Sequence, residues 1–137
     1  MSRRRAREMA LQVLFQVDVG KANPESALVY TLNECRATGV TADFTRTLVA
    51  GTLEHQQKID QYLTCYATDW DLPRMANVDR NILRLSLFEM LYYPATPVNV
   101  AIDEALELAK IFSHKEAARF INGILGRIAK EVAVEPG

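Results

Sequence analysis

Apolar residues recur at intervals of three and four positions along most of the chain, which is the spacing of one face of an α-helix. No segment shows the alternation of apolar and polar positions that is typical of a half-buried β-strand. The sequence therefore predicts an all-α protein of about six or seven helices with short connections. In the first predicted helix, the apolar face is formed by Ala6, Met9, Ala10, Val13, Leu14 and Val17.

Capping and helix-breaking residues give the boundaries of the predicted helices. Asn23 followed by Pro24 is typical of an N-cap and a first helical position. Pro94 and Pro97 are expected to end one helix and to begin the next. The predicted helices cover residues 3–19, 24–38, 41–66 with a bend or break near Gly51 or His55, 78–93, 98–111 and 114–131.

Two caps are predicted in the C-terminal half. Asn77 is expected to cap the helix over 78–93, which carries apolar residues on most of its faces and therefore belongs at the centre of the core. Ser113 and Glu116 have the spacing of a capping box, which would open the last helix.

The chain has 137 residues, which is enough for one domain with its own core. A break is predicted at residues 69–73. We expect it to separate an N-terminal helical subdomain of about residues 1–70 from a C-terminal one of about residues 74–131, as two small bundles packed together.

Composition excludes several classes of protein. The 16 Lys and Arg residues nearly balance the 17 Asp and Glu residues, which excludes a uniformly basic nucleic-acid binder. No apolar run approaches the roughly 18 residues needed to span a membrane. Cys35 and Cys65 do not combine with the two histidines at the spacing of a zinc site. No metal and no cofactor are therefore predicted.

Sequence patterns for catalysis are also missing. The chain has no phosphate-binding glycine loop and no pairing of a nucleophile with a base. Asp103 and Glu107 share one helix face, which is read as a solvated polar surface. The G-x-x-G at residues 123–126 lies in a helical pattern and is expected to allow close helix packing. We predict no catalytic residue and no enzyme.

An arginine cluster occupies the start of the first helix, at Arg3, Arg4, Arg5 and Arg7. Cations at a helix N-terminus are disfavoured by about 0.3–1 kcal/mol each, because the helix end is itself positive. One interpretation is a solvated run of charge. The other is a phosphate site, since arginine binds phosphate bidentately and the helix end also favours anions.

A second basic group lies at the start of the last helix, where His114, Lys115 and Arg119 are followed by Phe120. An aromatic ring beside arginine can stack on a single-stranded base. Alternatively, Phe120 belongs to the apolar stripe of the helix.

Several segments, in order along nearly the whole chain, match one known family. The first is RRRARE at residues 3–8, which leads into ALQVLF at residues 10–15. The others are F-x-x-x-L-V-x-G at 44–51, VDRNILRL at 78–85 with FEM at 88–90, PVNVAIDEALELAK at 97–110 and FINGIL at 120–125. With these segments the sequence resembles the NusB family of bacterial transcription antitermination proteins.

The resemblance implies two packed helical subdomains and a non-catalytic role in the bacterial cytoplasm. It implies pairing with the tenth protein of the small ribosomal subunit, also called NusE. The pair would bind the boxA element of nascent ribosomal transcripts as single-stranded RNA. It would act within the antitermination complex of RNA polymerase.

The resemblance also implies roles for individual residues. Asp79 and Arg80 lie where the partner-protein interface is expected. The chain departs from the family at residues 113–115, where other members often have a glycine-containing turn. The RNA-binding residues implied are Arg3, Arg4, Arg5, Arg7, Lys115, Glu116, Arg119 and Phe120.

Two other interpretations stay open. The same kind of domain occurs at the N-terminus of certain rRNA cytosine methyltransferases, so the chain could be a fragment of such an enzyme. A homodimer is also open, in which the arginines would face acids across a helical interface.

Overall fold

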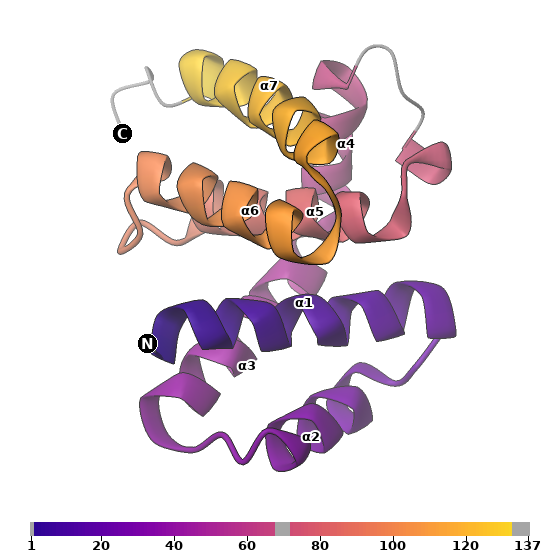
Figure 1. Ribbon diagram of the computed structural model, residues 1–137, viewed down its shortest axis with the longest axis vertical. Helices are drawn as coiled ribbons and strands as arrows, with labels where there is room; N and C mark the ends of the chain where they lie inside the picture. The colour runs from indigo at the N-terminus through magenta and orange to yellow at the C-terminus, as the bar shows by residue number, and fades with distance from the viewer. Residues whose placement is uncertain (1, 68–71, 133–137) are drawn as a thin grey trace.

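Helices account for nearly all of the described chain. The computed structural model describes residues 2–67 and 72–132, and these contain helices and no strand, which confirms the all-α prediction (Figure 1). The helices are α1 (Ser2–Gly20), α2 (Pro24–Glu34), α3 (Gly39–Glu54), α4 (Gln56–Tyr66), the short 3-10 helix η1 (Leu72–Arg74), α5 (Asn77–Tyr92), α6 (Val98–Phe112) and α7 (Lys115–Val132). Most of the predicted break at 69–73 lies outside the described residues.

Local sequence signals placed two boundaries correctly. The Asn23 side chain caps α2 by accepting a hydrogen bond from the backbone N–H of Ser26 at 3.0 Å. The predicted break in the third helix falls at His55, between α3 and α4. Helix α2 ends at Glu34, about four residues before the predicted end.

The other two predicted caps are wrong. Asn77 is the first residue of α5 rather than its N-cap, and its side chain accepts a hydrogen bond from Arg80 at 2.6 Å. Ser113 is the C-cap of α6, and no capping box forms. Instead His114 Nδ1 accepts the backbone N–H of Ala117 at 3.1 Å, so an imidazole nitrogen caps α7.

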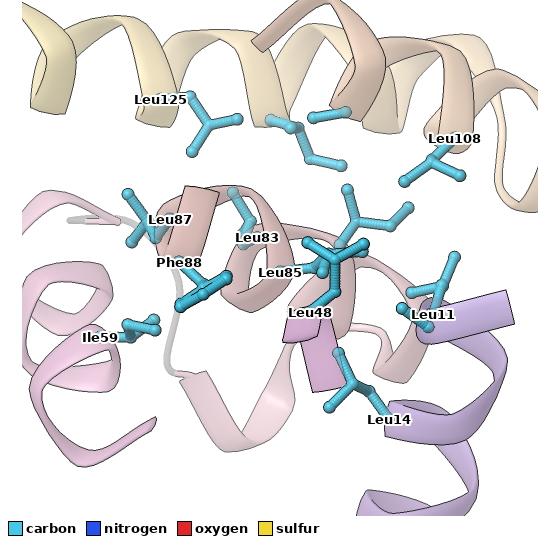
Figure 2. Close-up of a cluster of buried hydrophobic side chains, with 14 of the residues drawn as sticks. Leu11, Leu14, Leu48, Ile59, Leu83, Leu85, Leu87, Phe88, Leu108 and Leu125 are labelled. Carbon is cyan, nitrogen blue, oxygen red and sulfur yellow. The ribbon is translucent and has the colours of Figure 1, made fainter. Parts of the chain in front are cut away.

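Helix α5 lies at the centre of the core, as its apolar faces predict. Eleven of its residues are buried, and it packs against α1, α3, α4, α6 and α7. One apolar cluster runs through all of these helices (Figure 2). The cluster includes Leu11, Leu14, Leu48, Ile59, Leu83, Leu85, Leu87, Phe88, Leu108 and Leu125.

The helices form two groups around α5. In Figure 1, α1, α2 and α3 lie on one side, and α4, α6 and α7 lie on the other. Helix α4 packs mainly against α5 and α7, although it precedes the predicted subdomain boundary at about residue 70. The main apolar cluster extends across both predicted subdomains, and a smaller separate cluster of Met9, Leu32 and Ala42 joins α1, α2 and α3.

Gly51 is closely surrounded by other atoms, whereas Gly123 and Gly126 are not. A Cβ atom at Gly51 of α3 would lie 2.9 Å from Cδ1 of Phe88 and closer still to Cε1 and Cζ, so only glycine leaves room for this buried ring. The close packing predicted at Gly123 and Gly126 is wrong, because a Cβ atom at either position would meet nothing within 4 Å.

Replacing Gly51 with alanine is expected to lower the free energy of unfolding by about 1–3 kcal/mol, because the added methyl group must displace the Phe88 ring. Urea denaturation measures this change. The control is Gly126→Ala, which adds the same methyl group to open space on α7 and should leave stability unchanged or raise it by up to about 1 kcal/mol. Equal losses in the two variants would contradict the steric role of Gly51.

Candidate nucleic-acid interface

Three of the four clustered arginines lie at the exposed start of α1. Arg3, Arg4 and Arg5 are all exposed, and the first turn of α1 contains no acidic residue. The free backbone N–H groups of this turn add their partial positive charge to that of the guanidinium groups. This end of α1 therefore has the composition of an anion-binding surface.

Each of these three arginines is held by a different contact. The Arg3 guanidinium lies 4.5 Å from the centroid of the Phe44 ring, which is a cation–π contact. Arg4 makes two hydrogen bonds to Glu104 of α6, at 2.8 and 3.1 Å. Arg5 donates a hydrogen bond to the backbone carbonyl of Cys35, in the turn after α2.

The Arg4–Glu104 ion pair is partly exposed, and its strength depends on the ionisation of the acid. The hydrogen bond from Arg4 lowers the pKa of Glu104 below its ordinary value, although partial burial opposes this effect. The same contact raises the pKa of Arg4. The pair is therefore present throughout the neutral pH range and is lost only as the pH falls through the lowered pKa of Glu104.

Arg7 differs from the other three arginines in being buried, although it also lies 3.6 Å from Glu104, the partner of Arg4, and 5.5 Å from the centroid of the Phe44 ring, which Arg3 contacts. It is 4% exposed, and its Nε and Nη2 atoms donate to the two carboxylate oxygens of Glu89 on α5, at 2.7 and 2.8 Å. Burial by itself lowers the pKa of Arg7, but the hydrogen bonds and the charge of Glu89 outweigh it and raise the pKa. We therefore remove Arg7 from the expected RNA contacts and assign it a structural role.

The second predicted basic group lies at the start of α7. Lys115, Glu116 and Arg119 are exposed, whereas Phe120 is half-buried and packs against the apolar core. Phe120 thus belongs mainly to the apolar stripe of the helix, and its ring is only partly available for stacking on a base. The exposed residues still form a polar surface that could follow a nucleic-acid strand.

The two predicted RNA-binding groups do not merge into one patch. Phe112, which lies just before α7, lines a groove with residues 11–16 of α1. Those residues follow Arg4 by seven to twelve positions, which corresponds to roughly 10 to 18 Å along the helix. The start of α7 is therefore beside the middle of α1, and a ligand must extend along α1 to reach both groups.

Arg80, predicted at the partner interface, is buried in a polar network. It is 8% exposed and donates to Asp18 of α1 at 2.7 Å and to the carbonyl oxygens of Leu72 and Pro73. Burial raises the pKa of Asp18, but hydrogen bonds from Arg80 and Asn81 outweigh this effect and lower it. Arg80 joins α1, η1 and α5, so the expectation that it contacts a partner is corrected to a structural role.

Asp79 has a different environment from Arg80. It lies in the first turn of α5 and is 7% exposed, and its Oδ1 atom has no hydrogen-bond partner among the described residues. A buried polar atom without a partner costs free energy. A donor from another molecule could relieve this cost after a small movement of the side chain.

An apolar groove that the sequence did not predict is lined in part by Val78, the residue before Asp79. Its volume is about 300 Å³, and it lies between α1, the start of α5 and the end of α6. The sequence offered one signal for it, a large apolar residue at the end of a predicted helix, Phe112, which the structure leaves 37% exposed. The groove is lined by Leu11, Gln12, Phe15, Gln16, Val78 and Phe112.

The described residues contain no group of three His, Cys, Asp or Glu side chains that could hold a metal ion. None of the helices within residues 2–67 and 72–132 is long and apolar enough to cross a membrane.

Comparison with known proteins gives the family. The NusB family model matches residues 4–130. The chain belongs to the NusB family. The transcription antitermination protein NusB of Desulforamulus reducens is 53% identical over 128 residues, which cover 93% of this chain and 90% of that protein. NusB of Bacillus subtilis is 45% identical over 132 residues, which cover 96% of this chain and 98% of that protein.

Solved NusB structures share the fold. The NusB structure from T. maritima is 37% identical, with a TM-score of 0.87 and coverage of 94% of this chain and 91% of that one. A second structure, described as antitermination factors NusB and NusE in complex with double-stranded RNA, contains a chain with a TM-score of 0.88. That chain is 24% identical, and the match covers 95% of this chain and 97% of that one.

The difference between the buried Arg7 and the partly exposed Arg4 can be tested by measuring the stability of variants. Arg7→Ala is expected to lower the free energy of unfolding by about 3–5 kcal/mol, because it leaves the Glu89 carboxylate buried without its cation. Arg4→Ala, which breaks a partly exposed pair, should change stability far less. Both are measured by urea denaturation.

A double variant separates charge from packing. If Arg7 acts by neutralising Glu89, Arg7→Leu combined with Glu89→Leu should recover most of the stability lost in Arg7→Leu alone. A double variant as unstable as the sum of the two single variants would contradict this role.

Proposed function

We propose that this chain is a transcription antitermination factor of bacterial cells that binds boxA-type single-stranded RNA of nascent ribosomal transcripts. In this role it acts with NusE, the tenth protein of the small ribosomal subunit, in the antitermination complex of RNA polymerase. The chain carries out no chemical reaction in this proposal and contributes binding surfaces only.

The exposed start of α1 is the observation that carries the proposal. Arg3, Arg4 and Arg5 are presented to solvent on a chain that is otherwise more acidic than basic. Such a concentrated basic end on an acidic body suits binding of RNA at one place rather than over the whole surface. The names of the curated relatives support the antitermination role.

The start of α7 is the second part of the proposed RNA surface. Lys115 and Arg119 supply exposed positive charge, and Glu116 can accept hydrogen bonds from base edges. The half-buried Phe120 can offer at most part of its ring to a base. The groove that Phe112 lines just before this group lies roughly 10 to 18 Å along α1 from Arg4, which favours an extended strand over a compact ligand.

The apolar groove is the proposed docking site for NusE. It is lined mainly by apolar side chains, of which Phe112 is exposed, and its lining residue Val78 directly precedes Asp79, whose buried Oδ1 atom has no hydrogen-bond partner among the described residues. An apolar centre with an acid at its edge suits a basic ribosomal protein. The solved complex of NusB with NusE and RNA supports this pairing for a chain of the same fold.

Removing the three exposed arginines should weaken RNA binding and its salt dependence together. Replacing Arg3, Arg4 and Arg5 with alanine is expected to reduce the log–log salt slope by about 1.4, since each phosphate contact on a single strand contributes about 0.7 and Arg4 is already paired with Glu104. Fluorescence anisotropy with a boxA RNA and a scrambled RNA, each with and without NusE, measures both quantities.

A matched control loses the same charge elsewhere. Lys21, Lys58 and Lys130 are exposed residues on three other parts of the molecule, and their joint replacement with alanine should change the slope much less. Equal effects of the two triple variants would reduce the interaction to general attraction of a polyanion. Equal affinity for both RNAs under all conditions would contradict boxA recognition.

The NusE proposal is tested at the groove. Phe112→Ala and Phe15→Ala are each expected to weaken NusE binding about tenfold or more, because large apolar side chains at the centre of an interface carry much of its affinity. Isothermal titration calorimetry measures the dissociation constant. Tyr30→Ala is the control, since Tyr30 is 61% exposed on α2, away from the groove. Unchanged affinity in both groove variants would place NusE elsewhere.

A further inference from the structure

We propose that the RNA-binding surface extends from α1 onto the turn between α2 and α3, where Arg36 binds a phosphate of the same RNA strand. This inference rests on the proposed function. It adds a contact at Arg36, which lies outside the sequence motifs that match the NusB family.

The turn lies directly beside the arginine cluster. The Arg5 side chain donates a hydrogen bond to the carbonyl of Cys35, and Arg36 is the next residue. In Figure 1 the α2–α3 connection accordingly lies on the same side of the molecule as the N-terminus of α1. The backbone of Arg36 is therefore within a few ångströms of the Arg5 guanidinium group.

The backbone at Arg36 has a geometry that favours a different residue. The N–H of Ala37 bonds the carbonyl of Leu32 at 2.9 Å, and the N–H of Arg36 bonds that of Asn33 at 3.1 Å. These two bonds form a Schellman motif at the end of α2, with Arg36 at the left-handed position that glycine usually occupies. Its φ angle is +53°, which is unfavourable for a residue with a Cβ atom.

No contact of the Arg36 side chain among the described residues offsets the conformational cost of its left-handed backbone. It is exposed, and among the residues that the structure describes it makes no hydrogen bond or ion pair. Its favourable interaction with the C-terminal end of α2 would be available equally to a lysine or arginine one turn earlier in that helix, where no strain arises. The fold therefore gains little from an arginine at this position, whereas a bound anion would gain a charged donor.

The charges around the turn are mainly positive. Arg5 contacts it from α1, Arg3 lies on the same first turn of α1 and contacts Phe44 of α3, and Glu34, the last residue of α2, is the acid nearest to it in sequence. With Arg4 paired to Glu104, the unpaired positive charge at this end of the molecule comes from Arg3, Arg5 and Arg36. A phosphodiester backbone that passes over α1 toward the turn would meet all three.

The test exploits the strained backbone. Arg36→Gly should raise the melting temperature by about 3 °C, because glycine adopts the left-handed conformation without steric cost. The same substitution should weaken binding of boxA RNA about fivefold at 0.1 M salt and reduce the salt slope by about 0.7, which are the effects of losing one phosphate contact on a single strand. A variant that is more stable but binds more weakly cannot owe the weaker binding to unfolding.

The matched control is Lys21→Gly. Lys21 is also a basic, exposed residue with a left-handed backbone, at φ +55°, but it follows the opposite end of α1. This variant should gain similar stability and keep the affinity and salt slope of the wild-type protein. The pair of variants thus removes the same charge and relieves the same strain at two positions, one beside the start of α1 and one just after its end.

The outcomes separate this inference from the proposed function. If Arg36→Gly and Lys21→Gly bind RNA equally, while the variant lacking Arg3, Arg4 and Arg5 loses binding, the extension onto the turn is overturned and the α1 site stands. If the wild-type protein binds no RNA, with or without NusE, both proposals fail. Weaker binding of Arg36→Gly alone, with a smaller slope, supports the extension.

Discussion

The arrangement of α1 on α5 depends on the buried ion pair between Arg7 and Glu89. Two charges are removed from water there, and their desolvation is offset only because each carboxylate oxygen is satisfied. One oxygen accepts from Arg7 Nε, and the other accepts from Arg7 Nη2 and from the hydroxyl of Thr96. Since a bidentate pair has one good geometry, it fixes how far α1 lies along α5 and how α1 is rotated. It also ties both helices to the turn that precedes α6.

Because the rotation of α1 is fixed, three parts of this helix have three different roles. The face that carries Ala6, Ala10 and Leu14 enters the core beside Arg7. The first turn, beyond the core, is left to present arginines, and the middle of the helix forms one wall of the apolar groove. A single helix can therefore offer an anion surface at one end and an apolar surface farther along. The polar network of Asp18, Arg80 and Arg84 anchors its opposite end to α5, so both surfaces rest on a rigid element.

Helix positions could be predicted from the sequence, because apolar spacing and proline are local signals that the core reinforces. Caps were less predictable: at Ser113 the sequence offered a hydroxyl, and the chain used the imidazole of the next residue. The functional residues show the same limit. Nothing local distinguishes Arg7 from Arg3, since the difference is a carboxylate 82 positions away in the chain. Arg80 was assigned to the surface for the same reason, and the groove was missed because its walls come from three separate helices.

The ion pair of Arg4 with Glu104 bears on how the proposed RNA surface discriminates. Before Arg4 can bind a phosphate, it must break its two hydrogen bonds to the Glu104 carboxylate. In a partly exposed site this exchange costs little, but it also yields little net gain. Any polyanion meets this cost, and Glu104, which would keep only its longer contact with Arg7 at 3.6 Å, would then repel it more strongly. An RNA that positions its phosphates over Arg3, Arg5 and the α2–α3 turn avoids the exchange. On the proposed RNA surface, the geometry of the strand therefore matters in addition to its charge.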